Sequence, residues 1–549
     1  MGAYKQCTFI LTLSLSVAVS GSVFDVATIT EIEQLVTKAL ECRHVAGMTL
    51  SVFKGGDVWS RGFGSADISA GTPVDNSTLF NIGSVTKSFT MVLLGILLTE
   101  KKLDWTAKVM DILGPEYGFV DEYRTRESTL KDLLSHRTGL DSLGLGFLAG
   151  FSNVTREQLC KNMKFVPERM PFRDTFIYSN FMYMLLGHVA EKLGGDTWEN
   201  LVTSRVLQPI GMTSSKLMLK PADAYQMKTA RPYIYKDGMF QNGTKEIYDF
   251  HPMEPAGAIL SNGVDMAKYI RFIINMGKTD KGEQLLDPEL LKRSLFAVIP
   301  VDGEVNQNLK RPEFPVSDID LGYGQGWIES VYRGYHLIRH SGGVFSYITD
   351  LWIFPEHNFG LFASTNGPAL DSQFLAISAT FDHVTDRLLG LEPWINTTTA
   401  CTFPEPWRTA NDSAIPPVEN AAVLTNAKKY EGFYSSLILS GIRIELDGTS
   451  NTSLRFKMGK LGGILYSTLD KDRFLMEIRT PWEFYVSSMD KNNVTAKTNV
   501  TFIWDGDHVN TLQTHSPVPL NFTRRTHAGG EAANACDPRS HPGCISIVG

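Results

Sequence analysis

The stretch Asn81-Ile-Gly-Ser84-Val-Thr-Lys87 runs directly into the apolar segment Phe89–Leu98. An apolar segment of this length predicts a buried helix that begins near Ser84. Residues three apart lie on one face of a helix, so the Lys87 amine can reach the Ser84 hydroxyl and withdraw its proton. The unpaired amide groups at the helix N-terminus would favour the negative charge of a carbonyl under attack. The stretch therefore predicts an activated serine.

The spacing Ser-x-x-Lys is weak evidence by itself, because it recurs at Ser51/Lys54, Ser128/Lys131 and Ser488/Lys491. The first pair falls in a β-type run, where residues three apart point to opposite faces. Ser128 is expected to cap a short amphipathic helix, and the third pair leads into a turn with no helix behind it. Ser84 and Lys87 alone start a helix apolar enough to be buried. An ordinary polar helix start remains the alternative for them.

A second motif is Tyr178-Ser-Asn180, which precedes a helix expected over Phe181–Leu193 and is the only Tyr-x-Asn in the chain. A tyrosine beside Lys87 could have its pKa lowered by that positive charge and share the proton of Ser84. The Asn180 amide could hold Lys87 or a substrate amide. In isolation the motif is more often a packed tyrosine with an asparagine cap.

A third motif, His340-Ser341-Gly342-Gly343, ends a strand-like run. Glycines let a substrate approach the backbone closely, and the Gly343 N–H could pair with the Ser84 N–H as an oxyanion hole. A glycine hairpin turn is the commoner explanation for such a motif alone.

The order of the three motifs resembles the serine β-lactamase-related family, which includes class C β-lactamases, D-alanyl-D-alanine peptidases and related esterases. Further segments that resemble it are Leu133-Leu-Ser-His136-Arg-Thr-Gly-Leu140, Leu207-Gln-Pro-Ile-Gly-Met212, Pro255-Ala-Gly-Ala258 and Tyr323-Gly-Gln-Gly-Trp327. The likeness covers roughly residues 30–390. It implies an acyl-enzyme mechanism without a metal or organic cofactor.

The resemblance implies catalytic roles for Ser84 as nucleophile and for Lys87 and Tyr178 as proton-transfer groups. It implies substrate-binding or oxyanion roles for the following residues, with the last four on an edge strand: Asn180, His340, Ser341, Gly342 and Gly343. His340 stands where the antibiotic-resistance enzymes carry a lysine that helps to hold a substrate carboxylate. With an ordinary pKa of about 6.5 it would be charged only in an acidic compartment, so we do not expect true β-lactamase activity.

The chain is long and apolar enough for at least two cores, with 549 residues of which 43% are hydrophobic. Strands from both ends of the first part flank a helical insertion, which predicts an α+β fold: an antiparallel sheet flanked by helices with an all-α subdomain. Short alternating strands follow, typical of a small all-β C-terminal domain, either sandwich or barrel. The expected segments are 1–22 signal peptide, 23–392 hydrolase domain, 393–420 linker, 421–525 β domain and 526–549 Cys-containing tail.

The N-terminus has the order of a secretory signal peptide: Lys5, the apolar stretch Cys7–Val19 and the small residues Ser20-Gly-Ser22. With nine Asn-x-Ser/Thr sequons it predicts a secreted or lumenal glycoprotein. The candidate glycosylation sites are Asn76, Asn153, Asn242, Asn396, Asn411, Asn451, Asn493, Asn499 and Asn521.

Five cysteines remain after removal of the signal, which leaves one thiol unpaired. Cys536 and Cys544 enclose a short loop and are the candidates for a disulfide. The pairing of Cys42, Cys160 and Cys401 stays open. No Cys/His group has zinc-site spacing, so no metal is expected.

The net charge of −7 gives no basic surface for nucleic acid, and the mature chain has no segment expected to span a membrane. A small-molecule or peptide substrate is therefore expected. An α/β-hydrolase would need Gly-x-Ser-x-Gly, which the chain lacks. The remaining alternative to a serine hydrolase is a catalytically inactive scaffold of the same fold that binds a partner.

Overall fold

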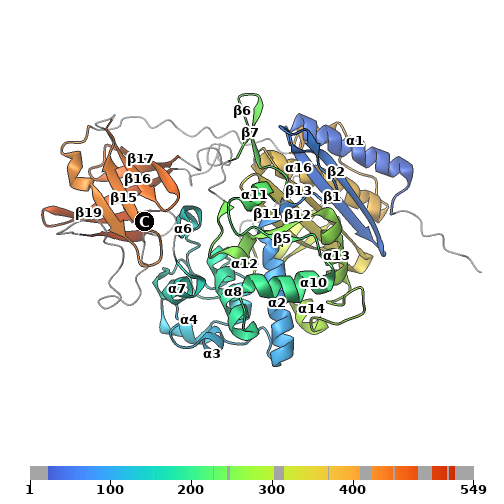
Figure 1. The fold of residues 1–549 in the computed structure, drawn as a ribbon, viewed down its shortest axis with the longest axis horizontal. Helices are drawn as coiled ribbons and strands as arrows, with labels where there is room; N and C mark the ends of the chain where they lie inside the picture. Colours follow the sequence, from blue (N-terminus) through green and yellow to red (C-terminus); the bar gives the residue numbers. More distant parts are fainter. Residues whose placement is uncertain are drawn as a thin grey trace, which may run out of the picture.

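The computed structural model of the chain describes residues 23–151, 154–226, 228–243, 248–301, 314–368, 370–407, 423–448, 452–479, 497–515 and 519–525. A mixed unit of sheet and helices is followed by a barrel of strands, drawn in orange and red in Figure 1. The expected signal peptide, residues 1–22, and the tail with Cys536 and Cys544 lie outside the described residues.

The first unit is built on an eight-stranded antiparallel sheet in the order β3-β2-β1-β13-β12-β11-β10-β9. Strands from the two ends of the unit meet at its centre, where Met48 on β1 is paired with Thr365 on β13. This confirms the α+β prediction. The strands are β1 (Gly47–Lys54), β2 (Asp57–Asp67), β3 (Thr72–Pro73), β9 (Asp318–Tyr323), β10 (Ile328–Tyr332), β11 (Tyr335–Val344), β12 (Tyr347–Phe354) and β13 (Phe359–Thr365).

Side chains alternate between two apolar cores across this sheet. On β13, Leu361 and Ala363 face the core that holds α1 (Val26–Cys42) and α16 (Leu370–Leu389), while Phe362 faces the larger core on the opposite side. Because successive strand residues point to opposite faces, one strand serves both layers. Helices therefore cover both faces, with α1 and α16 side by side on one of them (Figure 1).

The helical insertion covers the second face. Its central helix α2 (Thr86–Lys101) is buried at every position from Thr86 to Leu98, as its continuous apolar sequence predicts. The other elements of the insertion are η1 (Gly83–Val85), α3 (Val109–Leu113), α4 (Glu122–Glu127), α5 (Leu130–Leu134), α6 (Gly144–Ala149), α7 (Arg156–Lys161), η2 (Asn162–Phe165), α8 (Asn180–Gly194), α9 (Trp198–Val202), η3 (Thr203–Leu207), α10 (Gln208–Ile210), α11 (Asp223–Gln226), α12 (Glu254–Gly257), α13 (Gly263–Ile274) and α14 (Pro288–Leu295), with the short strands β4 (Phe80–Asn81), β5 (Lys216–Leu217), β6 (Tyr233–Lys236), β7 (Met239–Asn242) and β8 (Ile259–Ser261). The short helix η5 (Pro355–His357) lies between β12 and β13.

The C-terminal domain is a closed antiparallel barrel, so the open choice between sandwich and barrel is settled. Pairing of Tyr434 on β14 with Arg524 on β21 closes it. Its strands alternate as expected; in β16, Phe456 is buried between the exposed Arg455 and Lys457. The elements are η6 (Ala427–Tyr430), β14 (Gly432–Ser435), β15 (Ile442–Leu446), β16 (Ser453–Met458), β17 (Leu461–Ser467), β18 (Arg473–Ile478), β19 (Lys497–Asp505), β20 (His508–Thr514) and β21 (Leu520–Arg524).

Residues 393–407, which the sequence places in the linker, pack on the first unit instead. The helix α17 (Thr399–Thr402) is joined to α1 by a disulfide between Cys42 and Cys401, and Phe403 contributes to the core beside α1. Pro and Thr enrichment suggested a linker, but apolar side chains at intervals were enough to fix the segment. Cys160 is the free, buried thiol among the described cysteines.

Four of the candidate glycosylation sites are exposed, namely Asn76, Asn242, Asn396 and Asn521, and Asn499 is half-buried. Asn153, Asn411, Asn451 and Asn493 lie outside the described residues. Within the described part of the chain, no helix has both the length and the apolar character needed to cross a bilayer.

Candidate active site

Ser84 lies in η1, a single 3-10 turn between β4 and α2, and Lys87 is the second residue of α2. The turn is shaped by Asn81, whose side-chain oxygen accepts a 2.7 Å hydrogen bond from the Gly83 N–H, and by the positive φ of 52° at Gly83. The Lys87 Nζ is 3.0 Å from the Ser84 Oγ. The sequence-predicted pair therefore meets, with Ser84 partly exposed and Lys87 fully buried.

The Lys87 amine has two partners besides Ser84, and both are hydrogen-bond acceptors. Its Nζ is 2.8 Å from the Asn180 Oδ1 and 2.9 Å from the Ala256 carbonyl oxygen. Burial lowers the pKa of Lys87 well below its ordinary value. A neutral amine has two N–H donors and one lone pair, so with both donors used on Asn180 and Ala256 the lone pair is left for the Ser84 hydroxyl. This arrangement can accept a proton from Ser84.

The other two Ser-x-x-Lys pairs within the described residues do not meet in this way. On β1, Lys54 donates to the Leu388 carbonyl, away from Ser51. Ser128 ends α4, and Thr129 rather than Ser128 caps α5, which corrects the predicted cap. The Thr129 side chain accepts from the Asp132 amide, so the capping position is one residue later. Ser488 and Lys491 lie outside the described residues.

Tyr178 also joins the site, but its pKa differs from the prediction. The Lys87 Nζ lies 4.7 Å from the centroid of the Tyr178 ring. Burial raises the pKa of Tyr178, and its hydrogen bond with Ser84 offsets this only in part. The expected lowering by Lys87 is wrong, because Lys87 is itself depleted of charge by burial. Tyr178 is therefore a protonated phenol, a donor and not a base.

His136 supports the Tyr178 segment from behind. Its Nδ1 accepts a 3.1 Å hydrogen bond from the Ser179 N–H, and its ring centroid is 4.4 Å from that of Tyr178. Burial and the proximity of Lys87 and His340 lower the pKa of His136. The ring is therefore neutral, and it fixes the turn before α8.

The oxyanion candidate Gly343 is exposed and lies beside η1. The approach of the two segments depends on glycine: a Cβ on Gly342 would lie 2.0 Å from the Ile82 carbonyl oxygen, and one on Gly83 would lie 2.7 Å from the Gly343 nitrogen. The expected edge strand is an interior strand, since β11 lies between β12 and β10. However, β10 pairs with β11 only from Tyr335 to Arg339, so the segment 340–344 extends past it.

His340 does not face substrate in the expected way. It is 3% exposed, its Nε2 lies 2.9 Å from the Tyr323 hydroxyl and its Nδ1 lies 2.6 Å from the Ser341 carbonyl oxygen. Burial first, and then Lys87, lower the pKa of His340 to about 3. The prediction that it gains charge in an acidic compartment is therefore wrong. The bonding fits a neutral ring that donates from Nδ1 and accepts the Tyr323 hydroxyl at Nε2.

Sequence reasoning missed the Ala256 carbonyl as an acceptor for Lys87. A backbone oxygen has no side-chain signature, and Pro255-Ala-Gly-Ala258 entered the sequence argument only as part of a resemblance. The buried Arg156 beside it, which pairs with Glu191, Glu199 and Glu254, was also missed. Among the residues that the structure describes, no group of His, Cys, Asp or Glu could hold a metal ion.

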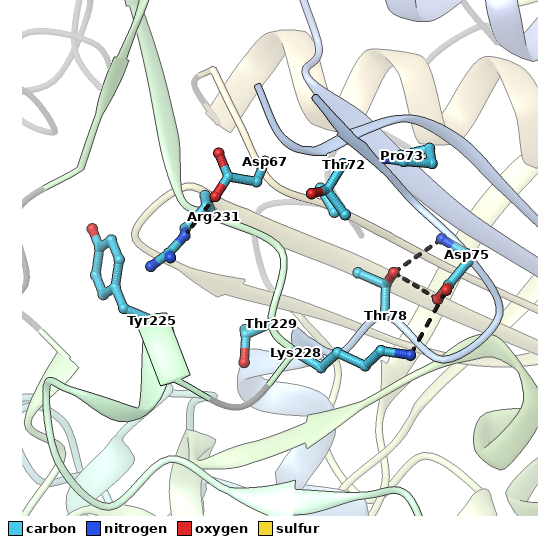
Figure 2. A pocket seen from close by; sticks show the side chains of 10 residues that line it. Asp67, Thr72, Pro73, Asp75, Thr78, Tyr225, Lys228, Thr229 and Arg231 are labelled. Carbon is cyan, nitrogen blue, oxygen red and sulfur yellow. Dashed lines mark hydrogen bonds and ion pairs between the residues drawn. The ribbon is translucent and has the colours of Figure 1, made fainter. Parts of the chain in front are cut away.

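A separate cavity of about 180 Å³ lies beside β2 and β3, as Figure 2 shows. Its charged side chains are already paired: Arg231 lies 3.1 Å from Asp67, and Lys228 lies 3.9 Å from Asp75. None of the residues of the three motifs lines it. The cavity is therefore separate from the site around Ser84.

Comparisons with known proteins identify the family and the fold. The chain is 27% identical over 367 residues to the unguisins hydrolase ungD of Aspergillus violaceofuscus, a match that covers 65% of this chain and 64% of that relative. In fold it is similar to the octameric penicillin-binding protein homologue from Pyrococcus abyssi, with 21% identity, a TM-score of 0.54, and coverage of 90% of this chain and 100% of that one.

The D-amino acid amidase from Ochrobactrum anthropi SV3, solved with L-phenylalanine amide, is also similar in fold. It is 20% identical with a TM-score of 0.53, over 66% of this chain and 98% of that one. The family model described as Beta-lactamase matches residues 32–383, which include all three motifs. The chain belongs to the Beta-lactamase family.

Proposed function

We propose that the protein is a serine hydrolase that cleaves ester, amide or small peptide bonds through an acyl-enzyme at Ser84. The observation that carries the proposal is the buried Lys87 amine, 3.0 Å from the Ser84 Oγ, with Asn180 and Ala256 as its hydrogen-bond acceptors. A neutral amine in this position is a general base for serine. One relative is named a hydrolase and one structural neighbour an amidase, which supports the same reaction class.

In the first half of the reaction, the Ser84 Oγ attacks the substrate carbonyl carbon while its proton passes to the Lys87 Nζ. The N–H groups of Ser84 and Gly343 receive the negative carbonyl oxygen. The bond from carbon to the leaving nitrogen or oxygen then breaks, and Tyr178 gives its proton to the leaving group as Lys87 returns one to Tyr178. The acyl group is now an ester of Ser84, the leaving group carries the proton from Tyr178, and the proton that Ser84 lost has passed through Lys87 to Tyr178.

In the second half, a water molecule attacks the acyl carbon and gives a proton to Lys87. The ester bond to the Ser84 Oγ breaks, and the proton returns from Lys87 to that oxygen. The product acid leaves and the site recovers its starting state. This cycle uses no metal and no organic cofactor.

The state of His340 supports neutral substrates over carboxylates. A buried ring with both nitrogens bonded and a pKa of about 3 offers no positive charge to a substrate carboxylate. We therefore expect a neutral ester or amide to react faster than a β-lactam that carries a carboxylate. A comparison of kcat/KM for a neutral aryl ester and a chromogenic cephalosporin tests this preference.

We also propose that the protein is a secreted or lumenal glycoprotein. The apolar N-terminal stretch supports this, and the Cys42–Cys401 disulfide fits an oxidising compartment. Mass spectrometry of the protein from culture medium, before and after removal of N-glycans, would reveal the mature N-terminus and the occupied sequons.

The central experiment is incubation of the purified protein with a fluorophosphonate probe, followed by location of the adduct by peptide mass spectrometry. We expect labelling at Ser84 that is lost in Ser84→Ala. The matched control is Ser204→Ala, which removes an exposed helical serine. If the folded wild type stayed unlabelled between pH 5 and 8, the inactive scaffold would be the better description.

A further inference from the structure

One segment of the first unit contacts both Lys87 and the turn that follows Gly343. Residues 248–257, which we call the strap, start at Tyr248 and end in the short helix α12. Tyr248 is fully buried, and so are most of the residues that follow in α12. The strap contributes a backbone carbonyl to the site. The position of this carbonyl depends on the residues that pack against the strap.

The C-terminal end of the strap holds Lys87. The Ala256 carbonyl lies 2.9 Å from the Lys87 Nζ, and the Pro255 carbonyl accepts a 2.8 Å hydrogen bond from Thr90, one turn along α2. Glu254 fixes this end, because Arg156 lies 2.8 Å from its carboxylate. The same Arg156 donates to the Pro252 carbonyl at 3.1 Å. The contacts of Arg156 and Thr90 with the strap therefore set the position of the Ala256 carbonyl.

The N-terminal end of the strap supports the turn after the oxyanion candidate Gly343. The Tyr248 hydroxyl donates to the Phe345 carbonyl, and the Tyr248 ring packs edge-on against the ring of Phe345. This turn holds two non-glycine residues at positive φ, Phe345 at 32° and Ser346 at 74°. Such a backbone needs external support to persist. The strap thus supplies the Ala256 carbonyl and also supports the turn that follows Gly343.

The barrel binds the strap between these two ends. Lys460, in the turn between β16 and β17, donates 2.9 Å to the Asp249 carbonyl, and its Nζ lies 3.1 Å from the Asp249 carboxylate. The Lys460 side chain is only 20% exposed. Its backbone N–H also donates to the Ala149 carbonyl at 2.8 Å, at the end of α6, which lies beside the barrel in Figure 1. A partly buried ammonium that binds both a carbonyl and a carboxylate holds its partner residue in place more strongly than an exposed ion pair does.

A second contact joins the barrel to α6, next to Phe181. Leu439 of the barrel packs so closely on α6 that a Cβ on Gly146 would lie 2.2 Å from it, and the Phe181 ring lies 3.6 Å from the same point. Phe181 directly follows Asn180, the other acceptor of Lys87. The barrel therefore packs on α6 at a point that Phe181 also approaches.

We propose that Lys460 of the barrel is a positioning residue for the Ser84 site, which acts through the strap. The inference rests on the proposed hydrolase function and makes the barrel part of the catalytic apparatus. The alternative is that Lys460 only joins two domains. In that case its loss lowers stability and leaves the reactivity of Ser84 unchanged.

The test uses the full chain with Lys460→Met, which keeps the apolar stem and removes the ammonium. The matched control is Lys457→Met, an exposed lysine on the same hairpin. We expect Lys460→Met to slow fluorophosphonate labelling of Ser84 by about threefold to thirtyfold, since small misplacements of catalytic groups have effects of this order. Lys460→Arg should retain the wild-type rate because it keeps a cationic donor.

Hydrogen exchange of the α12 and β11 peptides gives a readout that does not need activity. We expect faster exchange in Lys460→Met, and wild-type exchange in Lys457→Met. Unchanged labelling in folded Lys460→Met would overturn the proposal, whatever the exchange shows. If the wild type is not labelled at all, the hydrolase function fails, and the exchange data alone decide whether Lys460 positions the strap.

Discussion

In the proposed mechanism, the protonation state of Lys87 determines whether Ser84 can react. Burial lowers the pKa of Lys87 well below 10.5 in the folded chain, whereas the amine keeps its ordinary pKa in the unfolded chain. The unfolded state then binds more protons, so this group reduces stability at neutral pH and stability rises with pH through the window below 10.5. The base function of Lys87 therefore has a cost in stability.

The substitution Lys87→Met should separate activity from stability. It removes the base and leaves an apolar side chain of similar length in a buried position. We expect loss of Ser84 labelling together with a gain of about 1–2 kcal/mol in the free energy of unfolding, as at other active-site residues that trade stability for function. Denaturant unfolding at pH 7 measures the gain. A loss of stability in this variant would mean that the amine is charged and paired in the fold.

The pH dependence of labelling should follow Lys87 and not His340. Labelling falls on the acid side as Lys87 takes up a proton, whereas His340, with a pKa of about 3, stays neutral throughout pH 5–8. The variant His340→Gln retains an acceptor for the Tyr323 hydroxyl and should leave the midpoint of the acid limb unchanged. Stopped-time labelling at half-unit pH intervals measures it. A shift of the midpoint in this variant would assign the limb to His340.

At the scale of elements, the contact between η1 and β11 sets the oxyanion geometry. A Cβ at Gly342 would lie 2.0 Å from the Ile82 carbonyl oxygen, which is backbone and cannot rotate away. Gly342→Ala should therefore push β11 from η1 and slow Ser84 labelling by at least about tenfold, while Lys87 stays in place. Gly448→Ala is the matched control, because a Cβ there meets nothing within 4 Å. Equal rates in the two variants would exclude this contact from the reaction.

The elements that the sequence predicts best are those with one continuous signal. The sequence of α2 is mostly apolar over Phe89–Leu98, which predicts a buried helix, and the helix is buried at every position from Thr86 to Leu98. The strand β12 is also buried at every position, although it carries Thr349 and Asp350. The meeting of Ser84, Lys87 and Asn180 follows from motifs. The charge of His340 could not be predicted, because it depends on burial by Tyr323 and other distant residues. The Ala256 acceptor has no side-chain signal at all.

At the scale of the whole molecule, the Cys42–Cys401 disulfide joins the start and the end of the first unit. The two cysteines are 359 residues apart, so no local pattern could have paired them. The bond lies on the α1 face of the sheet, opposite the layer that holds Ser84, and Arg43 reinforces it with hydrogen bonds to the Ala400 carbonyl at 2.9 and 3.1 Å. Stability and catalysis are therefore supported from opposite faces of one sheet.

Reduction of this disulfide should destabilise the molecule without removing the nucleophile. A cross-link over a long loop restricts the unfolded chain, and the loss of such a bond typically costs about 2–5 kcal/mol. We expect Cys401→Ser to lose stability of this order in denaturant unfolding and to label at Ser84 at the wild-type rate in the absence of denaturant. Reductant should lower the wild-type midpoint towards that of the variant and leave the variant itself nearly unchanged. If reductant lowered the unfolding midpoint of both proteins equally, the stabilising disulfide would lie elsewhere. If Cys401→Ser slowed the labelling of Ser84, the α1 face would be coupled to the site through the sheet.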